Sequence, residues 1–428
     1  MTITDTAEKK EKVILVAIET GSDVSASASL DELGDLADTA GAMTVGRLIQ
    51  VREAPHPGTY IGKGKIEELR GMITELGAES VICDDELSPA QMSNLGDMLD
   101  VKVIDRTVLI LDIFASHARS GEGKLQVELA QLRYRSSHLV GMGKIMSRLG
   151  GGIGTRGPGE TKLETDRRLI RDRISVLNKK LRSMVQNREI KRSVRSESNI
   201  PTVAIVGYTN AGKSTLINYL TGADVLSEDK LFATLDTTTR SMETEQGQRF
   251  LFTDTVGFIN KLPHALIKAF RSTLEEAGYA DIIMHVVDLS NPAYEDQMRV
   301  VYDTLKELDI KGKPVLTVFN KMDIVASPGV KRESGPISPK ASEGVRDRYA
   351  NETVFISAGE GYGVDELISK LIGIADDGMI GIEKLFGFDE AGKINYIRTY
   401  GRLIEEKYLE EGIMVKARIP ADGMHRIE

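Results

Sequence analysis

Hydrophobic positions in the first hundred residues follow two alternating patterns. Short continuous apolar runs predict buried strands at residues 13–19, 44–52, 80–83 and 101–105. Between these runs, apolar residues recur every three or four positions, as from Leu30 to Leu36, which indicates amphipathic helices. Gly77 suits a helix end, and Ser88, which proline follows, suits a helix start. This alternation predicts a small α/β domain over residues 1–106.

From residue 107 onward the apolar residues keep a helical period. They occur at Leu125, Leu129 and Leu132, and again at Ile170, Ile174, Leu177, Leu181 and Met184. Residues 141–159 lie between the two sets and contain eight glycines in nineteen positions, a composition that we do not expect inside a helix. We therefore predict that residues 107–195 form two antiparallel helices joined by a flexible glycine-rich tip, with the apolar stripe packed between them.

The strand and helix patterns alternate again after a polar linker at residues 192–199. An apolar run at 203–206 ends in a glycine, and the alternation from there predicts a second α/β domain over residues 200–375, with a mostly parallel sheet. Its Pro/Gly/Ser-rich segment, 326–339, is read as a surface loop. Residues 376–428 mix short strand and helix patterns and predict a small C-terminal α+β domain. The expected fold class is thus α/β with these additions.

Composition indicates a soluble globular protein and excludes several other classes. The chain has 428 residues, 41% hydrophobic and 28% charged, which predicts two or three domains. Its longest apolar run, 281–289, is interrupted by His285 and too short to span a bilayer, and residues 1–12 lack the apolar core of a signal peptide. The single cysteine, Cys83, excludes an internal disulfide and fits a reducing compartment, so we expect a cytoplasmic protein.

Charge is distributed unevenly along the chain. The net charge is −9, but residues 117–195 hold 19 Lys+Arg and 7 Asp+Glu and therefore carry +12, which leaves −21 for the rest. A basic segment in an acidic protein suggests a face that binds a polyanion. The alternative is an ordinary solvated helical surface.

The segment that follows the run at 203–206 matches the phosphate-binding pattern G-x-x-x-x-G-K-[ST] at every position. In this pattern, backbone N–H groups surround the β-phosphate and the N-terminus of the next helix adds positive partial charge. We expect Lys213 to contact the β- and γ-phosphates and the Ser214 hydroxyl to bind Mg²⁺. The expected nucleotide-binding residues are Gly207, Tyr208, Thr209, Asn210, Ala211, Gly212, Lys213, Ser214 and Thr215.

A second motif, N-K-x-D, follows the apolar strand pattern at 314–319 and indicates the base. The Asp323 carboxylate can accept hydrogen bonds from N1–H and the 2-amino group of guanine, which adenine does not offer in that arrangement. The stem of Lys321 can cover the face of the ring. Backbone amides of a further loop would contact the guanine O6. The expected base-binding residues are Asn320, Lys321, Met322 and Asp323, with Ser357, Ala358 and Gly359.

Two further segments predict switch loops that respond to the γ-phosphate. In the D-T-V-G string, Asp254 would hold Mg²⁺ through water and the Gly257 amide would bond the γ-phosphate, with Thr255 and Val256 between them. An earlier segment would supply Thr234 as the second hydroxyl on Mg²⁺, although several threonines crowd this region. That segment consists of Phe232, Ala233, Thr234, Leu235 and Asp236. We assign the hydrolysis machinery to Lys213, Ser214, Thr234 and Gly257.

Phe258 occupies the position where related GTPases often place a glutamine that orients the attacking water. A phenyl ring cannot position water by hydrogen bonding, so we expect slow intrinsic hydrolysis that another group or a partner accelerates. Asn210 is a candidate for binding K⁺ beside the phosphates; its other interpretation is an ordinary polar residue of the phosphate loop. The six histidines and one cysteine predict no metal site besides that of Mg²⁺.

Beyond these motifs, the chain resembles the HflX family of ribosome-associated GTPases over roughly residues 13–374. Besides G-Y-T-N-A-G-K-S and D-T-V-G-F, the strings that carry the resemblance are YIGKGK at 60–65, DRTVLILDIF at 105–114, GEGKLQVELAQ at 121–131 and GTRGPGETKLETDRR at 154–168. The family often reads D-P-T after the switch threonine, whereas this chain reads D-T-T at 236–238. Losing that proline frees a φ angle, so we expect a more mobile first switch.

The resemblance implies a GTPase that binds the large ribosomal subunit and splits stalled or idle ribosomes, notably under heat stress. It further implies that the basic hairpin, residues 119–195, inserts its glycine-rich tip toward ribosomal RNA. Family members also carry a hydrophobic residue at the position of Phe258. Some members are reported to hydrolyse ATP in their N-terminal region, but residues 13–105 contain no motif for it.

Two other functions remain open at this point. One is a GTP-regulated ribosome biogenesis or RNA-binding factor that does not split mature ribosomes. The other is a signalling switch whose hairpin binds a protein coiled coil, which the +12 charge of residues 117–195 disfavours. We expect no DNA partner, no membrane insertion and a monomeric state.

Overall fold

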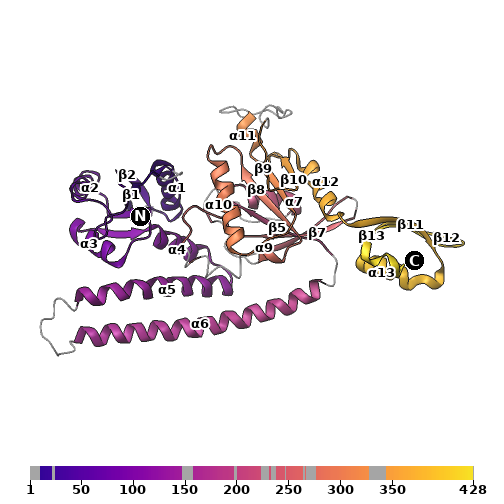
Figure 1. Ribbon diagram of the computed structural model, residues 1–428, viewed down its shortest axis with the longest axis horizontal. Coiled ribbons are helices and arrows are strands. Elements are labelled where there is room, and N and C mark those ends of the chain that lie inside the picture. The colour runs from indigo at the N-terminus through magenta and orange to yellow at the C-terminus, as the bar shows by residue number, and fades with distance from the viewer. Residues whose placement is uncertain are drawn as a thin grey trace, which may run out of the picture. The chain divides into compact units, whose positions relative to one another are not determined.

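The computed structural model (Figure 1) describes residues 10–21, 25–146, 158–196, 200–222, 231–232, 238–245, 247–263, 266, 276–326 and 344–427. Its contacts define two compact units. The first comprises Met1–Ser183, Glu228–Leu235 and Ile259–Arg271, and the second comprises Met184–Ser227, Asp236–Phe258 and Ser272–Glu428.

The first unit is built on a four-stranded sheet in the order β2-β1-β3-β4, in which every neighbouring pair is parallel. The strands are β1 (Lys12–Glu19), β2 (Met43–Val51), β3 (Ser80–Cys83) and β4 (Lys102–Asp105). The two inner strands, β1 and β3, are the most completely buried, as their continuous apolar runs predict. The predicted N-terminal α/β arrangement is therefore confirmed.

Four helices accompany this sheet, and their ends follow the sequence signals. They are α1 (Ala26–Thr39), α2 (Lys63–Leu76), α3 (Pro89–Leu99) and α4 (Arg106–His117). Gly77 ends α2 in the left-handed conformation with φ 64°, which glycine adopts without a steric cost. Ser88 starts α3 through a capping box with Gln91, and the Asp105 carboxylate caps α4.

Two long helices, α5 (Gly121–Met146) and α6 (Pro158–Ser196), form the predicted hairpin arms. A bidentate ion pair joins them, in which Arg173 donates to both carboxylate oxygens of Glu128 at 2.7 and 3.0 Å. Leu129 and Leu177 are buried, as expected for the apolar stripe. The expectation that residues 141–159 lie outside helix was wrong at both ends, since helical hydrogen bonding tolerates the cost of a glycine, about 1 kcal/mol each. The expected tip at 147–157 is outside the described residues.

The second unit holds a six-stranded sheet in the order β10-β9-β8-β5-β7-β6. All its pairs are parallel except β6–β7. The strands are β5 (Thr202–Gly207), β6 (Thr239–Glu243), β7 (Arg249–Asp254), β8 (Ile282–Asp288), β9 (Val315–Asn320) and β10 (Glu352–Phe355). The helices are α7 (Lys213–Thr221), α9 (Glu276–Tyr279), α10 (Tyr294–Glu307), α11 (Met322–Ala326) and α12 (Val364–Ala375). This confirms the mostly parallel sheet.

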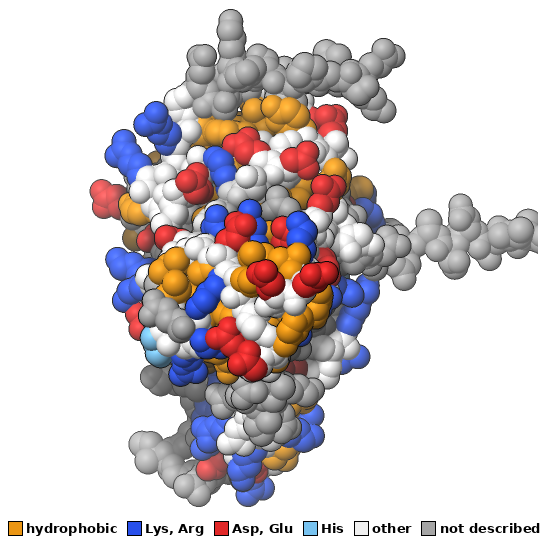
Figure 2. All heavy atoms as spheres, turned by 90° about the vertical axis from the view of Figure 1, so that its right-hand side faces the viewer, with side chains coloured by type: hydrophobic (Ala, Val, Ile, Leu, Met, Phe, Trp, Pro, Cys, Tyr) orange, Lys and Arg blue, Asp and Glu red, His pale blue; other side chains and the backbone are white. Residues whose placement is uncertain are grey.

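The C-terminal residues form an antiparallel sheet in the order β11-β13-β12, with a helix (Figure 1). The elements are β11 (Met379–Phe386), η2 (Phe388–Glu390), α13 (Ala391–Tyr400), β12 (Arg402–Leu409), β13 (Gly412–Pro420) and η3 (Ala421–Arg426). Phe386, Ile397 and Val415 are central to its own small core, which confirms the predicted α+β segment. Figure 2 shows hydrophobic, acidic and basic side chains interleaved on the face that it presents. None of the helices in the described ranges is long and apolar enough to cross a membrane.

Candidate nucleotide site

The phosphate-binding loop follows β5, the strand at which the order of strand addition reverses. The chain adds β6 and β7 on one side of β5 and β8 on the other, so the loop lies at a topological switch point, where ligands of α/β sheets bind. Gly207 lies against β8 so closely that a Cβ atom there would be 2.2 Å from the carbonyl oxygen of Val286. Gly212 caps α7 with φ 88°, and a Cβ atom there would be 2.3 Å from Asn320 Nδ2. Both glycines of the motif are therefore required by close backbone approach.

Lys213 is the first residue of α7 and is buried inside the loop that precedes it. Its Nζ donates to the carbonyl oxygens of Gly207 at 3.1 Å and Tyr208 at 2.7 Å. Burial lowers the pKa of the Lys213 ammonium to about 8, and the nearby Asp254 carboxylate opposes that decrease. An ammonium held by carbonyl oxygens in a buried loop is suited to exchange them for the anionic oxygens of a phosphate.

Asn320 connects the phosphate loop to the loop that is expected to bind the base. Its Nδ2 donates to the Ala211 carbonyl oxygen at 2.9 Å, and its Oδ1 accepts from the Ala358 amide at 2.9 Å. Asn320 is buried at the end of β9, so one side chain fixes two segments that are far apart in sequence. The predicted motifs at residues 207–214, 320–323 and 357–359 are thereby brought together.

The side chains that should recognise the base lie next to one another. Asp323 Oδ1 accepts a hydrogen bond from Ser357 Oγ at 2.7 Å. Lys321 has φ 64° and pairs with Asp288, with Nζ and Oδ2 2.8 Å apart. Met322 is buried in the core and supports the loop. Sequence analysis did not foresee Asp288, although its place at the end of β8 next to β9 is a signal that could have found it.

The D-T-V-G segment follows β7 and lies against the phosphate loop. Asp254 is fully buried, and the Thr255 hydroxyl donates to the Ile205 carbonyl oxygen at 2.7 Å. Phe258 N–H donates to the Gly207 carbonyl oxygen at 3.1 Å, and the Thr209 N–H donates to the Phe258 carbonyl oxygen at 2.8 Å. These bonds hold the two loops together on both sides of Gly257.

The first switch segment is described only at Leu231 and Phe232. The ring of Phe232 packs edge-on against Phe114 with centroids 4.7 Å apart, a contact that the sequence did not suggest. The Leu231 amide donates to the Thr39 hydroxyl at 3.3 Å. The remaining predicted residues, Ala233, Thr234, Leu235 and Asp236, lie outside the described residues.

Sequence reasoning also missed a charged cluster in the first unit. Lys261 lies just after the D-T-V-G segment. It pairs with Asp84 and with Asp85 Oδ1, the latter at 2.7 Å. Asp84 further accepts from Arg106 at 2.8 Å and from Ser29 at 2.7 Å. The acidic run after β3 was visible in the sequence, but nothing local paired it with a lysine 177 residues away.

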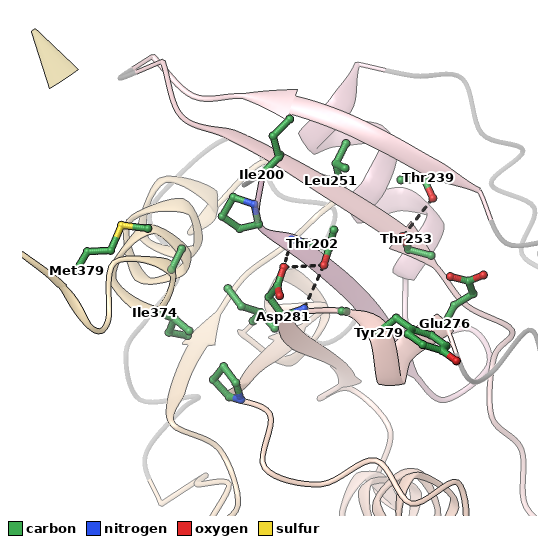
Figure 3. Close-up of a pocket in the computed structure, with 15 residues that line it drawn as sticks. Ile200, Thr202, Thr239, Leu251, Thr253, Glu276, Tyr279, Asp281, Ile374 and Met379 are labelled. Atoms are coloured by element: carbon green, nitrogen blue, oxygen red, sulfur yellow. Dashed lines mark hydrogen bonds between the residues drawn. The ribbon is translucent and has the colours of Figure 1, made fainter. Parts of the chain in front are cut away.

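A cavity of about 440 Å³ lies at the opposite end of the central sheet (Figure 3). It opens at the amino end of β5, where Thr202 donates through its amide and its hydroxyl to Asp281 Oδ2 at 2.8 and 2.7 Å. The described residues that line it include none of the predicted nucleotide residues. The candidate nucleotide site is therefore the one at the carboxyl end of the sheet, where the glycine contacts and the Lys213 and Asn320 bonds lie. Within the described ranges, no cluster of His, Cys, Asp and Glu could hold a metal ion.

The phosphate-binding loop between β5 and α7 buries Lys213, and Asn320 links this loop to the segment in which Asp323 and Ser357 are hydrogen-bonded. This arrangement defines a P-loop GTPase. Family models agree with this class along most of the chain. Residues 27–115 match the GTP-binding GTPase N-terminal model, 117–195 match the GTP-binding GTPase middle region, and 202–321 match the 50S ribosome-binding GTPase model.

Curated relatives identify the family. The chain is 56% identical to the GTPase HflX of Lacrimispora saccharolytica, over 97% of this chain and 95% of that protein. It is 38% identical to the GTPase HflX of Escherichia coli, over 99% and 97% of the two chains. The chain therefore belongs to the HflX family of GTPases, as the sequence motifs suggested. A solved GTP-binding protein of Sulfolobus solfataricus in complex with GDP is also similar, with 24% identity, a TM-score of 0.43, and coverage of 86% and 99%.

Proposed function

We propose that this GTPase binds the large ribosomal subunit, splits stalled or idle ribosomes, and uses GTP hydrolysis to time its release. The observation that carries the proposal is the charge of +12 on residues 117–195, in a chain whose net charge is −9. The described part of that segment is a pair of long helices, α5 and α6. The relatives named HflX and the description of the model matched by residues 202–321 support the same partner.

The basic residues of α6 are available to a polyanion. Six described ones are exposed along the helix, and one of them, Arg173, pairs with Glu128; the six are Arg168, Arg171, Arg173, Lys179, Lys180 and Arg182. Tyr134, the aromatic residue of the arms, is half-buried and its hydroxyl donates to Asp105 at 2.9 Å, so it is not free to stack on bases. Recognition of folded RNA by charge and shape suits such a surface, and its affinity should fall steeply with salt.

Mg²⁺ and K⁺ belong to this proposal. The Ser214 and Thr234 hydroxyls would ligate Mg²⁺ together with phosphate oxygens, and Asp254 would hold it through water, an all-oxygen set that Mg²⁺ prefers. The buried Asp254 at the end of β7 fits this arrangement, because a buried carboxylate needs positive charge nearby. Asn210 is exposed with φ 59° on the loop, where it could contact K⁺. Since Phe258 is buried and apolar, we propose slow hydrolysis that the ribosome stimulates.

We further propose a cytoplasmic monomer with no DNA partner and no membrane insertion. We keep the expected domain limits, 1–106, 107–195, 200–375 and 376–428. In this proposal the hairpin at 107–195 binds RNA and the domain at 200–375 binds and hydrolyses GTP. In the C-terminal domain, Phe388, Tyr400 and Tyr408 are exposed, and the view in Figure 2 shows hydrophobic, acidic and basic side chains interleaved on one face of the molecule.

The direct test is sedimentation of purified 70S ribosomes with the protein and a non-hydrolysable GTP analogue. Splitting moves material from the 70S peak into 50S and 30S peaks. An unchanged 70S peak with the protein bound would contradict splitting and favour the biogenesis or RNA-binding alternative.

A matched pair of variants assigns the effect to the hairpin. One replaces Arg168, Arg171, Lys179 and Lys180 by glutamine, and the other replaces Arg299, Lys306, Lys311 and Lys313 of the α10 region. The charge change is the same in both. We expect only the α6 variant to lose ribosome binding, by about tenfold or more, while both keep their basal GTPase rate.

A further inference from the structure

Thr209, the third residue of the phosphate-binding loop, carries a buried hydroxyl for which the described part of the chain offers no hydrogen-bond partner. The side chain is 7% exposed, and none of the described residues forms a hydrogen bond with its Oγ1. The other buried threonine of the site, Thr255, is different, because its hydroxyl donates to the Ile205 carbonyl oxygen. Buried hydroxyls normally have a partner, so the exception at Thr209 calls for a functional explanation.

The position of Thr209 is fixed beside the γ-phosphate side of the site. Its amide donates to the Phe258 carbonyl oxygen at 2.8 Å. A Cβ atom on Gly257 would be 2.8 Å from Thr209 Cγ2 and 3.1 Å from Lys213 Nζ, so these three residues meet at one point. Gly257 supplies the amide expected to bond the γ-phosphate, and Lys213 the ammonium. The Thr209 side chain thus lies where the terminal phosphate would be held.

The other side chains that the structure describes at this point, Phe258, Asn210 and Lys213, cannot replace the glutamine that orients water in related GTPases. Phe258 is 2% exposed and apolar, and its amide is bonded to Gly207. Asn210 is exposed rather than buried in the loop. Lys213 has no capacity to accept a hydrogen bond from water. A threonine hydroxyl can both donate and accept, as a group that aligns water against a phosphate must.

We propose that the Thr209 hydroxyl contacts the attacking water and orients it toward the γ-phosphorus. The water oxygen forms the new bond to phosphorus while the bond to the β–γ bridging oxygen breaks. The electron pair of that bond stays on GDP, and the proton of the water passes to a γ-phosphate oxygen, which yields inorganic phosphate. Thr209 is unchanged at the end. The proposal rests on GTP hydrolysis by this chain and is independent of its ribosomal partner.

The test compares Thr209→Val, which keeps the shape, with Thr209→Ser, which keeps the hydroxyl. Single-turnover GTP hydrolysis is measured without ribosomes at saturating nucleotide, together with GDP affinity and the affinity for GDP with aluminium fluoride. We expect Thr209→Val to slow hydrolysis by about 10- to 100-fold and to weaken only the aluminium fluoride complex. Thr209→Ser should recover most of the hydrolysis rate.

Thr221→Val serves as the matched control, because the Thr221 hydroxyl bonds the Ile217 carbonyl oxygen inside α7. It should hydrolyse GTP at the wild-type rate. A Thr209→Val protein with wild-type turnover would overturn the proposal, and so would a Thr209→Ser protein as slow as Thr209→Val. A parallel loss of GDP affinity in Thr209→Val would also overturn it, since the residue would then serve binding. No turnover in the wild-type protein would instead contradict the GTPase activity itself.

Discussion

The parallel sheet of the first unit and the mostly parallel sheet of the second both have polar side chains at the carboxyl ends of parallel strands. These side chains find their hydrogen-bond and ion-pair partners differently in the two sheets. In the first unit, Asp84 accepts hydrogen bonds or ion pairs from Ser29, Arg106 and Lys261. Asp105, at the end of the next strand, accepts from the Leu87 and Val108 amides and the Tyr134 hydroxyl. The protein itself occupies these groups.

At the corresponding edge of the central sheet, the polar groups are held ready for another molecule. Glycine allows the backbone of the loop to approach β8 and Asn320, Lys213 is buried with a lowered pKa, and Thr209 keeps an unpartnered hydroxyl among the described residues. A buried charge cluster alone therefore does not indicate a binding site. The nucleotide site differs from the first unit in combining glycines that allow close backbone approach with a buried lysine and a buried threonine hydroxyl.

The largest expected effect is that of Gly207→Ala, which removes the close approach on which the central site depends. The new Cβ atom would lie 2.2 Å from the Val286 carbonyl oxygen, and Gly207 pairs with Val286 in the sheet, so neither strand can move freely. We expect a loss of stability of about 3 kcal/mol or more, with loss of nucleotide binding. Urea denaturation and GDP titration measure both.

Gly373→Ala is the matched control for that substitution. Gly373 lies in α12 with nothing within 4 Å of a new Cβ atom, so we expect a gain of about 0.5–1 kcal/mol from helix propensity. Equal destabilisation by both variants would contradict the steric argument.

The second effect concerns the carboxyl end of the first sheet, where the charged side chains pair with one another. Arg106 is 1% exposed and pairs with Asp84 and Glu32, so Arg106→Met removes a buried cation from both carboxylates, although Lys261 still pairs with Asp84. We expect destabilisation by up to about 3 kcal/mol, because Lys261 still compensates Asp84, with GDP affinity unchanged. The exposed pair of Arg47 and Asp31 is the control, and Arg47→Gln should cost about 0–1 kcal/mol. A loss of GDP affinity in Arg106→Met at temperatures where it is folded would show that the first edge takes part in nucleotide binding.

The third effect concerns the residue expected to recognise the guanine base at the carboxyl end of the central sheet. In Asp323→Asn, the amide donates where the carboxylate accepted, so the N1–H and 2-amino groups of guanine lose their partner. We expect GTP affinity to fall by about 100-fold and xanthosine triphosphate to become the preferred ligand. Competition between the two nucleotides measures the preference. Unchanged GTP affinity would place the base elsewhere.

The smallest effect is a pH dependence of nucleotide binding. The pKa of Lys213 is about 8 in the protein without nucleotide, and a bound phosphate raises it because the anion favours the ammonium. Binding therefore takes up a proton above pH 8, and GDP affinity should fall by up to about tenfold between pH 8 and 9, with little change between pH 7 and 7.5. Calorimetry in buffers of different ionisation enthalpy measures the proton uptake. A flat affinity to pH 9 would contradict the lowered pKa.

The sequence predicted the features that depend on neighbouring residues. The strands at β1, β3 and β5, the helix end at Gly77 and the phosphate loop at 207–214 all follow from local pattern and backbone sterics. The family followed from strings of the same kind. The strands, the helix end at Gly77 and the family are confirmed, and each is determined within a few residues.

Features that depend on distant partners could not be predicted in this way. Asn320 bridges Ala211 and Ala358 across separations of 109 and 38 residues. Lys261 meets Asp84 only after both strands are placed, and the idle hydroxyl of Thr209 is visible only once its surroundings are known. The continuation of α5 past Gly141 shows a different error. The high glycine content predicted an early end of the helix, but hydrogen bonding with the preceding turns extends it to Met146.

The measurement that tests the central claim most directly is GTP turnover with and without purified 50S subunits, first in potassium and then in sodium buffer. The account predicts slow turnover alone, strong stimulation by 50S subunits, and loss of that stimulation in the α6 glutamine variant but not in the α10 control. Equal turnover with and without 50S subunits would contradict the claim that the ribosome completes this GTPase, and would leave the open edge of the central sheet with a different partner.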